Sequence, residues 1–111
     1  MSKIFVQIAS FNDKELYKTV MDCVNKSSGK NEISFGIHEC YIDNKTIFDL
    51  DNVSIEYSKA PQNIGVGIGR YIANKLYNNE DYYLQVDSHS RFKENWDLIL
   101  INDIKNYYLV F

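Results

Sequence analysis

A chain of 111 residues, of which 45% are apolar, is long enough for one domain with a buried core and too short for two. Its net charge of −3 argues against nucleic acid or an anionic membrane as a partner, because the phosphates of such surfaces are held mainly by clustered Lys and Arg. Any phosphate bound by this chain therefore needs another source of positive charge.

The N-terminal part predicts a strand, a helix and a second strand. Residues 4–9 form a nearly continuous apolar run, which is typical of a strand buried on both faces at the centre of a parallel sheet. A helix follows, with Asn12 as its cap, Glu15 in the capping-box position and Gly29 as its stop. The alternation of apolar and polar residues over 33–40 predicts the second strand.

The middle of the chain predicts two more strands and a helix between them. Residues 43–52 are polar and predict a loop with a short hairpin, before a third strand at 53–57. A helix is expected from about residue 63 to residue 78, and residues 82–86 predict a strand near the centre of the sheet. The apolar stripe of this helix is expected to face the core and consists of Ile64, Ile68, Ile72 and Leu76, widened by Tyr71.

The last segments complete an alternating pattern. Asn95 is expected to cap a third helix, and a final strand is expected from residue 107 onwards. The order β-α-β-β-α-β-α-β predicts an α/β fold with a mostly parallel sheet, flanking helices and ligands bound at the carboxyl ends of the strands. Because the chain stops inside an apolar segment, we expect it to be truncated or part of a longer protein.

The first apolar run and the cysteines indicate where the protein is found. Gln7 interrupts the run, and Asn12 and Asp13 follow it, so it suits neither a signal-peptide core nor a membrane span. Cys23 and Cys40 are too few for a disulfide scaffold and are expected as buried thiols in a reducing compartment. We therefore expect a cytoplasmic protein.

Three polar residues, Asp87, Ser88 and His89, directly follow the strand at 82–86. Side chains two residues apart on an extended strand point to the same side, so Asp87 and His89 are expected to converge on one divalent cation. A carboxylate with an imidazole suits manganese or a similar borderline ion, although zinc also accepts this pair. The alternative interpretation is that Asp87 caps a turn and that His89 is an exposed loop residue.

The surroundings of these residues resemble the core of GT-A glycosyltransferases. In that group a glycine-led helix with an arginine, here Gly65 and Arg70, precedes a strand that ends in Asp-X-Asp or Asp-X-His. The run EDYYLQVDSHSRF at 80–92 is similar to that of the N-acetylglucosaminyltransferase family that includes the cytoplasmic enzyme acting on hydroxyproline of Skp1. The resemblance covers nearly the whole chain, although residues 67–69 depart from the family pattern.

The resemblance implies that residues 1–111 are the nucleotide-sugar-binding part of a GT-A, or Rossmann-like, domain that transfers a sugar with retention of configuration. It implies UDP-GlcNAc as the donor, a hydroxyl acceptor with protein side chains among the candidates, and a divalent metal, Mn²⁺ by preference, held by Asp87 and His89. Polypeptide N-acetylgalactosaminyltransferases also carry Asp-Ser-His, so the donor sugar stays open. The nucleotide sugar is expected to contact Ser10, Phe11, Asn12, Gly65, Arg70, Asp87 and Ser88.

Several of these residues also have a structural interpretation. Phe11 either stacks on the base or packs in the core, and Asn12 either hydrogen-bonds the nucleotide or caps the helix. Arg70 either contacts the diphosphate, pairs with Asp87 or is a solvated helix residue. Arg91 either contacts a phosphate or pairs with an acidic neighbour. For the whole chain, the alternatives to an enzyme are a non-catalytic nucleotide-sugar-binding fragment and a metal-free α/β interaction module.

Overall fold

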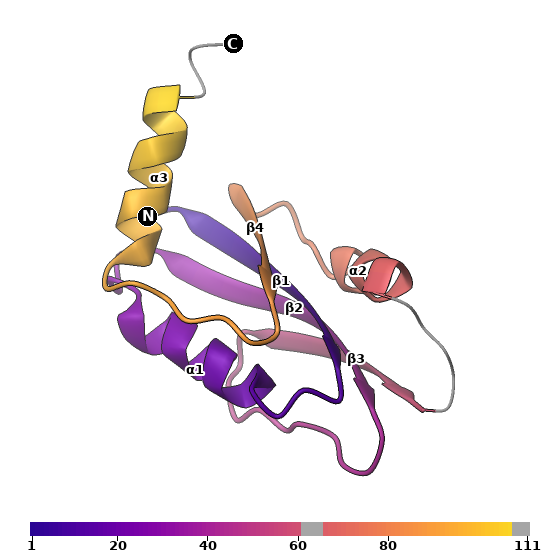
Figure 1. Cartoon of the computed structure of the whole chain (residues 1–111). Helices are drawn as coiled ribbons and strands as arrows, with labels where there is room; N and C mark the ends of the chain where they lie inside the picture. Colours follow the sequence, from indigo (N-terminus) through magenta and orange to yellow (C-terminus); the bar gives the residue numbers. More distant parts are fainter. Residues whose placement is uncertain (61–65, 108–111) are drawn as a thin grey trace.

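In the computed structural model, which describes residues 1–60 and 66–107, strands and helices alternate along most of the chain (Figure 1). The elements in chain order are β1 (Lys3–Phe11), α1 (Leu16–Lys26), β2 (Glu32–Tyr41), β3 (Val53–Lys59), α2 (Val66–Asn74), β4 (Tyr82–Asp87) and α3 (Trp96–Tyr107). This order confirms the predicted α/β class. Of the final strand expected from residue 107, Tyr107 belongs to α3 and the rest lies outside the described residues.

The sheet has the strand order β3-β2-β1-β4, and every strand pair within the described residues is parallel. β1 lies inside it, as predicted, with Ile4 opposite Ile33 of β2 and opposite Tyr82 of β4. The prediction that β4 also lies near the centre is wrong for the described chain, where β4 forms an edge. Because α2 packs over β1, β2 and β3, one face of β4 stays open, and Tyr83 and Asp87 are exposed there.

Residues 42–52 connect β2 to β3 without a helix. The predicted short hairpin is wrong, because residues 42–52 contain no strand. Asn52 fixes the end of the loop: its side chain donates to the Ile33 carbonyl at 2.7 Å, and its carbonyl accepts from the Phe35 amide at 2.9 Å. The loop therefore returns along the sheet to the amino end of β2, where β3 starts.

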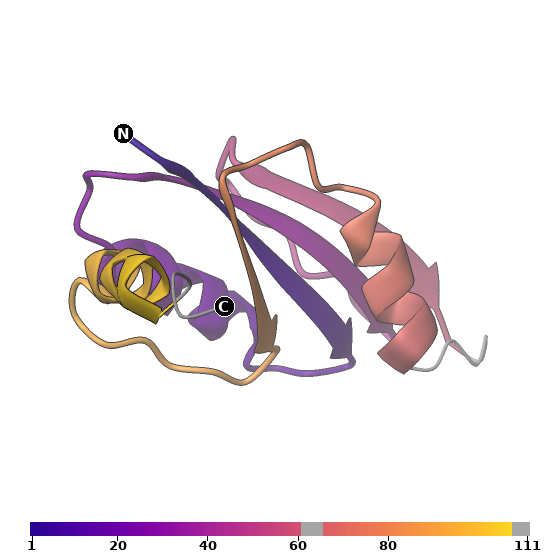
Figure 2. The same cartoon turned by 90° about the horizontal axis from the view of Figure 1, so that it is seen from above.

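Helices α1 and α3 cover one face of the sheet, and α2 covers the other (Figure 2). The main core lies on the side of α1 and α3 and is formed by Ile4, Val6, Ile8, Leu16, Val20, Cys23, Ile33, Phe35, Ile37 and Trp96. Trp96 joins the two helices, because its indole Nε1 donates to the Cys23 carbonyl at 2.9 Å.

Cys23 and Cys40 are buried and form no disulfide, as expected. None of the helices in the described part of the chain is long and apolar enough to cross a membrane.

α2 packs closely on the sheet because glycine stands at the contact. A Cβ atom at Gly36 of β2 would overlap the Phe5 ring and would lie 3.0 Å from the Ala73 carbonyl oxygen. A Cβ atom at Gly69 of α2 would lie 3.0 Å from Nδ1 of His38. Both glycines, together with Ala73, are buried between the helix and the sheet. The distance between α2 and the sheet is thus set by missing side chains on both partners.

The face that α2 turns to the sheet differs from the prediction. Ile68 and Tyr71 were expected in the core stripe, but they are 54% and 62% exposed. The small residues Gly69 and Ala73 occupy the contact instead, because only they fit the short distance. The helix also ends at Asn74, earlier than expected, and its expected start near residue 63 lies outside the described residues.

α1 begins at Leu16 without the predicted capping box. Asn12 has a φ of 43°, and its amide donates to the Cys40 carbonyl at 2.8 Å, so it turns the chain after β1 instead of capping the helix. Asparagine adopts this left-handed backbone more readily than most residues. Glu15 takes the N-cap position without a side-chain cap, and its amide donates to Asp13 Oδ1 at 2.9 Å.

Asp97, in the first turn of α3, ties this helix to the connection between α1 and β2. It is fully buried, and its carboxylate accepts hydrogen bonds from the Ser28 amide at 2.9 Å, the Ser28 hydroxyl at 2.6 Å and the Asn31 side chain at 2.8 Å. Burial raises the pKa of Asp97, but these hydrogen bonds outweigh it, so that the pKa lies below its usual range.

Replacing Gly36 by Ala should lower the free energy of unfolding by about 1–3 kcal/mol, because the added methyl group overlaps Phe5 and presses on the backbone of α2. Gly67→Ala is the matched control, since nothing lies within 4 Å of a Cβ atom there and alanine favours a helix. Urea unfolding of both variants and the parent measures the difference. Equal stability of all three proteins would contradict the close contact.

Asp97→Asn should destabilise the chain by about 1.5–3 kcal/mol near neutral pH. The side-chain NH2 group of the new Asn would face N–H and O–H donors, whereas the carboxylate of Asp97 accepts hydrogen bonds from them. The pKa of Asp97 is lower in the folded chain than in the unfolded one, so its contribution is complete above the unfolded value of about 3.9 and is lost as the pH falls through the folded value. In urea titrations, the gap between parent and variant should therefore shrink only below about pH 4. A gap that grows on acidification contradicts this role.

Candidate functional site

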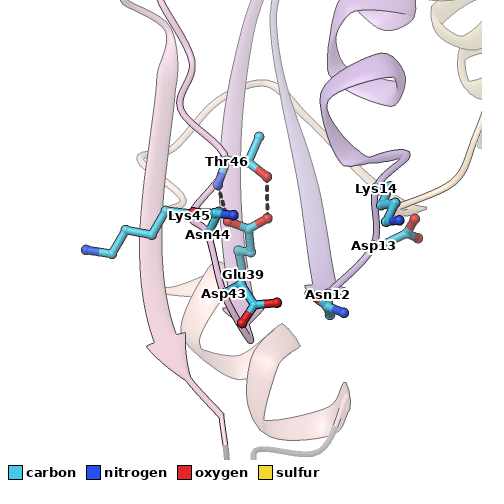
Figure 3. A pocket seen from close by; sticks show the side chains of 8 residues that line it. All are labelled: Asn12, Asp13, Lys14, Glu39, Asp43, Asn44, Lys45 and Thr46. Carbon is cyan, nitrogen blue, oxygen red and sulfur yellow. Dashed lines mark hydrogen bonds between the residues drawn. The ribbon is translucent and has the colours of Figure 1, made fainter.

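The carboxyl ends of β1, β2 and β4 bring polar residues to one edge of the sheet. A pocket of about 300 Å³ opens there between the β1–α1 connection and the loop after β2 (Figure 3). It is lined by Asn12, Asp13, Lys14, Glu39, Asp43, Asn44, Lys45 and Thr46. The volume lies at the lower end of the range of ligand pockets, and the pocket occupies the edge where α/β folds bind their ligands.

Glu39 shapes this pocket by holding the loop after β2. Its side chain is buried, and the carboxylate accepts from the Thr46 amide at 2.7 Å and from the Thr46 hydroxyl at 2.5 Å (Figure 3). The Thr46 carbonyl in turn accepts from the Tyr57 hydroxyl of β3 at 2.7 Å. The wall of the pocket is therefore fixed by side chains of two neighbouring strands. Glu39 was not predicted as a site residue, because the loop that it binds follows no regular pattern in the sequence.

Asp13 joins the pocket to the turn after β4. Its Oδ2 accepts from the Ser88 hydroxyl at 2.6 Å and lies 3.0 Å from Nδ1 of His89, while Oδ1 accepts from the Glu15 amide. Burial raises the pKa of Asp13, but the hydrogen bonds from Ser88, Glu15 and His89 outweigh it and leave the pKa below its usual range. Asp13 was not predicted as a site residue, because its partners lie 75 and 76 residues away along the chain.

Asp87 and Arg70 meet on the opposite side of β4, which faces α2. Arg70 Nη2 lies 3.3 Å from Asp87 Oδ1, and Nη1 donates to Gln7 Oε1 at 3.2 Å. Gln7 is buried, and its amide nitrogen donates to the Arg70 carbonyl at 3.0 Å and to the Tyr83 hydroxyl at 2.9 Å. Gln7 therefore orients Arg70 toward Asp87. This glutamine is a second site residue that the sequence analysis missed, having read it only as an interruption of an apolar strand.

Arg91 also has an acidic neighbour. Its Nη2 donates to Glu15 Oε1 at 2.5 Å, and its Nη1 donates to the Ser90 carbonyl at 2.9 Å. The hydrogen bond from Arg91 is the main reason why the pKa of Glu15 lies below its usual range. For both arginines, the structure contains a pairing with an acidic residue that was among the interpretations from the sequence.

The two expected metal ligands have separate neighbours. β4 ends at Asp87, and Ser88 and His89 form a turn. His89 therefore does not continue the extended strand on which its side chain was expected to point to the same side as that of Asp87. Asp87 Oδ2 and His89 Nε2 make no hydrogen bond within residues 1–60 and 66–107. In the same ranges, no group of three or more His, Cys, Asp or Glu side chains gathers closely enough to hold a metal ion.

Three of the residues expected to hold the nucleotide, Ser10, Phe11 and Asn12, lie at or directly after the end of β1. Ser10 is buried, and its hydroxyl is the one buried side-chain polar atom of the described residues that lacks a hydrogen-bond partner. Phe11 is 56% exposed, so its interpretation as a core ring is wrong. Asn12 lines the pocket, and Gly65 lies outside the described residues.

Comparison with known proteins identifies the family of the chain. A family model described as Glycosyltransferase (GlcNAc) matches residues 39–108, which is more than half of the sequence. The match contains Glu39, Arg70, Asp87 and His89, whereas β1, Asp13 and α1 precede it. Comparisons with curated proteins and with solved structures found no match.

Glu39→Ala should release the loop after β2, because Thr46 then loses both of its hydrogen bonds to the carboxylate. Amide hydrogen exchange measures this directly, and the Thr46 amide should exchange at least about tenfold faster in the variant. Asp43→Ala is the control, since this exposed carboxylate also lines the pocket but makes no hydrogen bond to Thr46. Unchanged exchange at Thr46 in Glu39→Ala would show that the loop is held by other contacts.

Proposed function

The chain belongs to the Glycosyltransferase (GlcNAc) family, and we propose that it is the nucleotide-sugar-binding part of a metal-dependent enzyme that transfers N-acetylglucosamine from UDP-GlcNAc to a hydroxyl acceptor. The observation that carries this proposal is that Asp87, His89 and a polar pocket all lie at the same carboxyl edge of a parallel sheet. Parallel α/β folds use this edge to bind nucleotides and other phosphorylated ligands. A protein side chain is the acceptor that we favour.

The pocket beside Asp13 and Glu39 is proposed to hold the nucleoside of the donor. Its polar lining offers acceptors for the ribose hydroxyls and both donors and acceptors for the base. Phe11, exposed at the end of β1, supplies an aromatic face next to Asn12 on the rim. The buried Ser10 hydroxyl, which has no partner within the described residues, fits a site whose hydrogen bonds are completed by a ligand.

Asp87 and His89 are the residues proposed to hold a divalent ion, and their free atoms fit that role. Oδ2 of Asp87 and Nε2 of His89 are an oxygen and a nitrogen donor without hydrogen bonds among the described residues, a pair that suits Mn²⁺. When bound, such an ion would neutralise the charge that develops on the leaving nucleotide diphosphate. Further coordination positions would fall to the diphosphate oxygens, since the described ranges contain no group of three or more His, Cys, Asp or Glu side chains that could hold the ion.

Arg70 is proposed to exchange partners when the donor binds. Its pair with Asp87 is exposed on the carboxylate side, where the side chain of Asp87 is 68% exposed, and such pairs contribute little stability. A diphosphate offers a stronger acceptor for the guanidinium than one carboxylate oxygen. The exchange leaves both oxygens of Asp87 available, while Gln7 still holds the backbone of Arg70.

A non-catalytic binding fragment is the second candidate, and it is favoured because the described residues contain no group of three or more His, Cys, Asp or Glu side chains that could hold a metal ion. The two candidates differ in turnover. An enzyme releases UDP from UDP-GlcNAc when an acceptor or water is present, whereas a fragment binds the donor and leaves it intact. Quantifying free UDP after incubation with Mn²⁺ separates them.

Asp87→Asn and His89→Ala should each weaken Mn²⁺-dependent binding of UDP-GlcNAc by more than about tenfold, because each removes one of only two protein ligands. Both side chains are exposed, so the free energy of unfolding should change by less than about 1 kcal/mol. Titration calorimetry with and without Mn²⁺ measures the affinity, and urea unfolding measures the stability.

Asp49→Asn is the matched control, because it removes an exposed carboxylate of the loop at 42–52 that lines no part of the pocket. This variant should bind like the parent protein. If Asp87→Asn and His89→Ala bind the donor as tightly as the parent does with Mn²⁺, the two residues are not ligands and the motif is only a turn.

A further inference from the structure

Asp13 is held on both of its oxygens between the start of α1 and the turn after β4. Oδ1 accepts from the Glu15 amide at 2.9 Å, and Oδ2 accepts from the Ser88 hydroxyl at 2.6 Å and lies 3.0 Å from His89 Nδ1. The carboxylate therefore cannot turn away from the imidazole without losing two other hydrogen bonds. Asp13 was not among the residues predicted from the sequence to bind the donor, and it precedes the range that the family model matches.

This contact decides which ring nitrogen of His89 carries the hydrogen. An ionised carboxylate only accepts, so a neutral imidazole beside it carries its hydrogen on Nδ1 and keeps its lone pair on Nε2. Nε2 makes no hydrogen bond within the described part of the chain, and the His89 side chain is 68% exposed. The nitrogen that bears the lone pair is thus the accessible one.

The backbone of the turn is fastened independently of Asp13. Thr19 of α1 is fully buried, and its hydroxyl donates to the Ser88 carbonyl at 2.7 Å and accepts from the Ser90 amide at 3.0 Å. Removing the Asp13 carboxylate therefore releases the imidazole of His89 but leaves the turn attached to α1. An effect on the ring can for this reason be distinguished from an effect on the fold.

We propose that Asp13 is a positioning residue that holds His89 in the Nδ1–H tautomer, with Nε2 open toward a divalent metal. The role toward a metal rests on the function proposed above. A carboxylate that accepts from the second nitrogen of a histidine ligand fixes the orientation of the ring and raises its basicity. Loss of such a partner lowers metal affinity by about 10- to 100-fold. Asp13 acts on the metal only through His89.

The tautomer can be measured without any metal. The chain has only two histidines, so long-range ¹H–¹⁵N spectra of the labelled protein at about pH 8.5, where imidazole is ordinarily neutral, resolve His89, and a His89→Gln variant assigns it. The parent should show hydrogen on Nδ1 and a bare Nε2. In Asp13→Ala the hydrogen should move to Nε2 in most molecules. An Nε2–H tautomer in the parent, or an unchanged tautomer in a folded Asp13→Ala, overturns the proposal.

Ser88→Ala is the matched control, because it removes one hydrogen bond to Asp13 and leaves the contact between Asp13 and His89. Its tautomer should equal that of the parent, and a shift as large as in Asp13→Ala would show that the turn, not the carboxylate, sets the ring.

A separate titration with Mn²⁺ and UDP tests the role of Asp13 toward the metal. Asp13→Ala should lower the affinity for Mn²⁺ by about 10- to 100-fold, as is typical when a histidine ligand loses such a partner. Absence of Mn²⁺ binding in the parent would refute the proposed function, whereas equal Mn²⁺ affinity in parent and Asp13→Ala would refute the positioning of His89 for a metal. The tautomer result stands apart from both, since it is obtained on the metal-free chain.

Discussion

The close contact between α2 and the sheet sets the geometry at the end of β4. Gly36 and Gly69 allow the helix to approach, and Arg70 follows the second glycine directly in the sequence. At this distance the Arg70 carbonyl and guanidinium both reach Gln7, and the guanidinium also reaches Asp87. A larger separation would lengthen both bonds between Arg70 and Gln7. The electrostatic environment of Asp87 therefore depends on two missing side chains under the helix.

The strands were predictable because their patterns are local. The apolar run at 4–9 and the alternation at 33–40 each predicted a strand that the structure contains, since burial on both faces or on one face leaves its period in the sequence. Asp87, Ser88 and His89 were placed correctly at a strand end by the same reasoning. Their roles in binding stay predictions, as does the metal itself.

The features that the sequence did not predict depend on contacts between distant segments. Asp13 faces Ser88 and His89 across 75 and 76 residues, and no local pattern marks such a partner. Ile68 has the spacing of a core residue but is exposed, because the packing distance of α2 is set by Gly36 on another strand. The edge position of β4 likewise follows from the strand order, which sequence periodicity does not encode.

The double hydrogen bond of Thr19 has a consequence for the cost of binding. Because α1 clamps the turn on both sides of His89, the backbone there is ordered before any ligand arrives, and association does not have to spend conformational entropy on it. Arg70, by contrast, has to give up an existing partner. The two sides of β4 would then contribute differently to recognition. The preordered turn at His89 favours slow release of a ligand, whereas the contact of Arg70 with a ligand would weaken as the ionic strength rises.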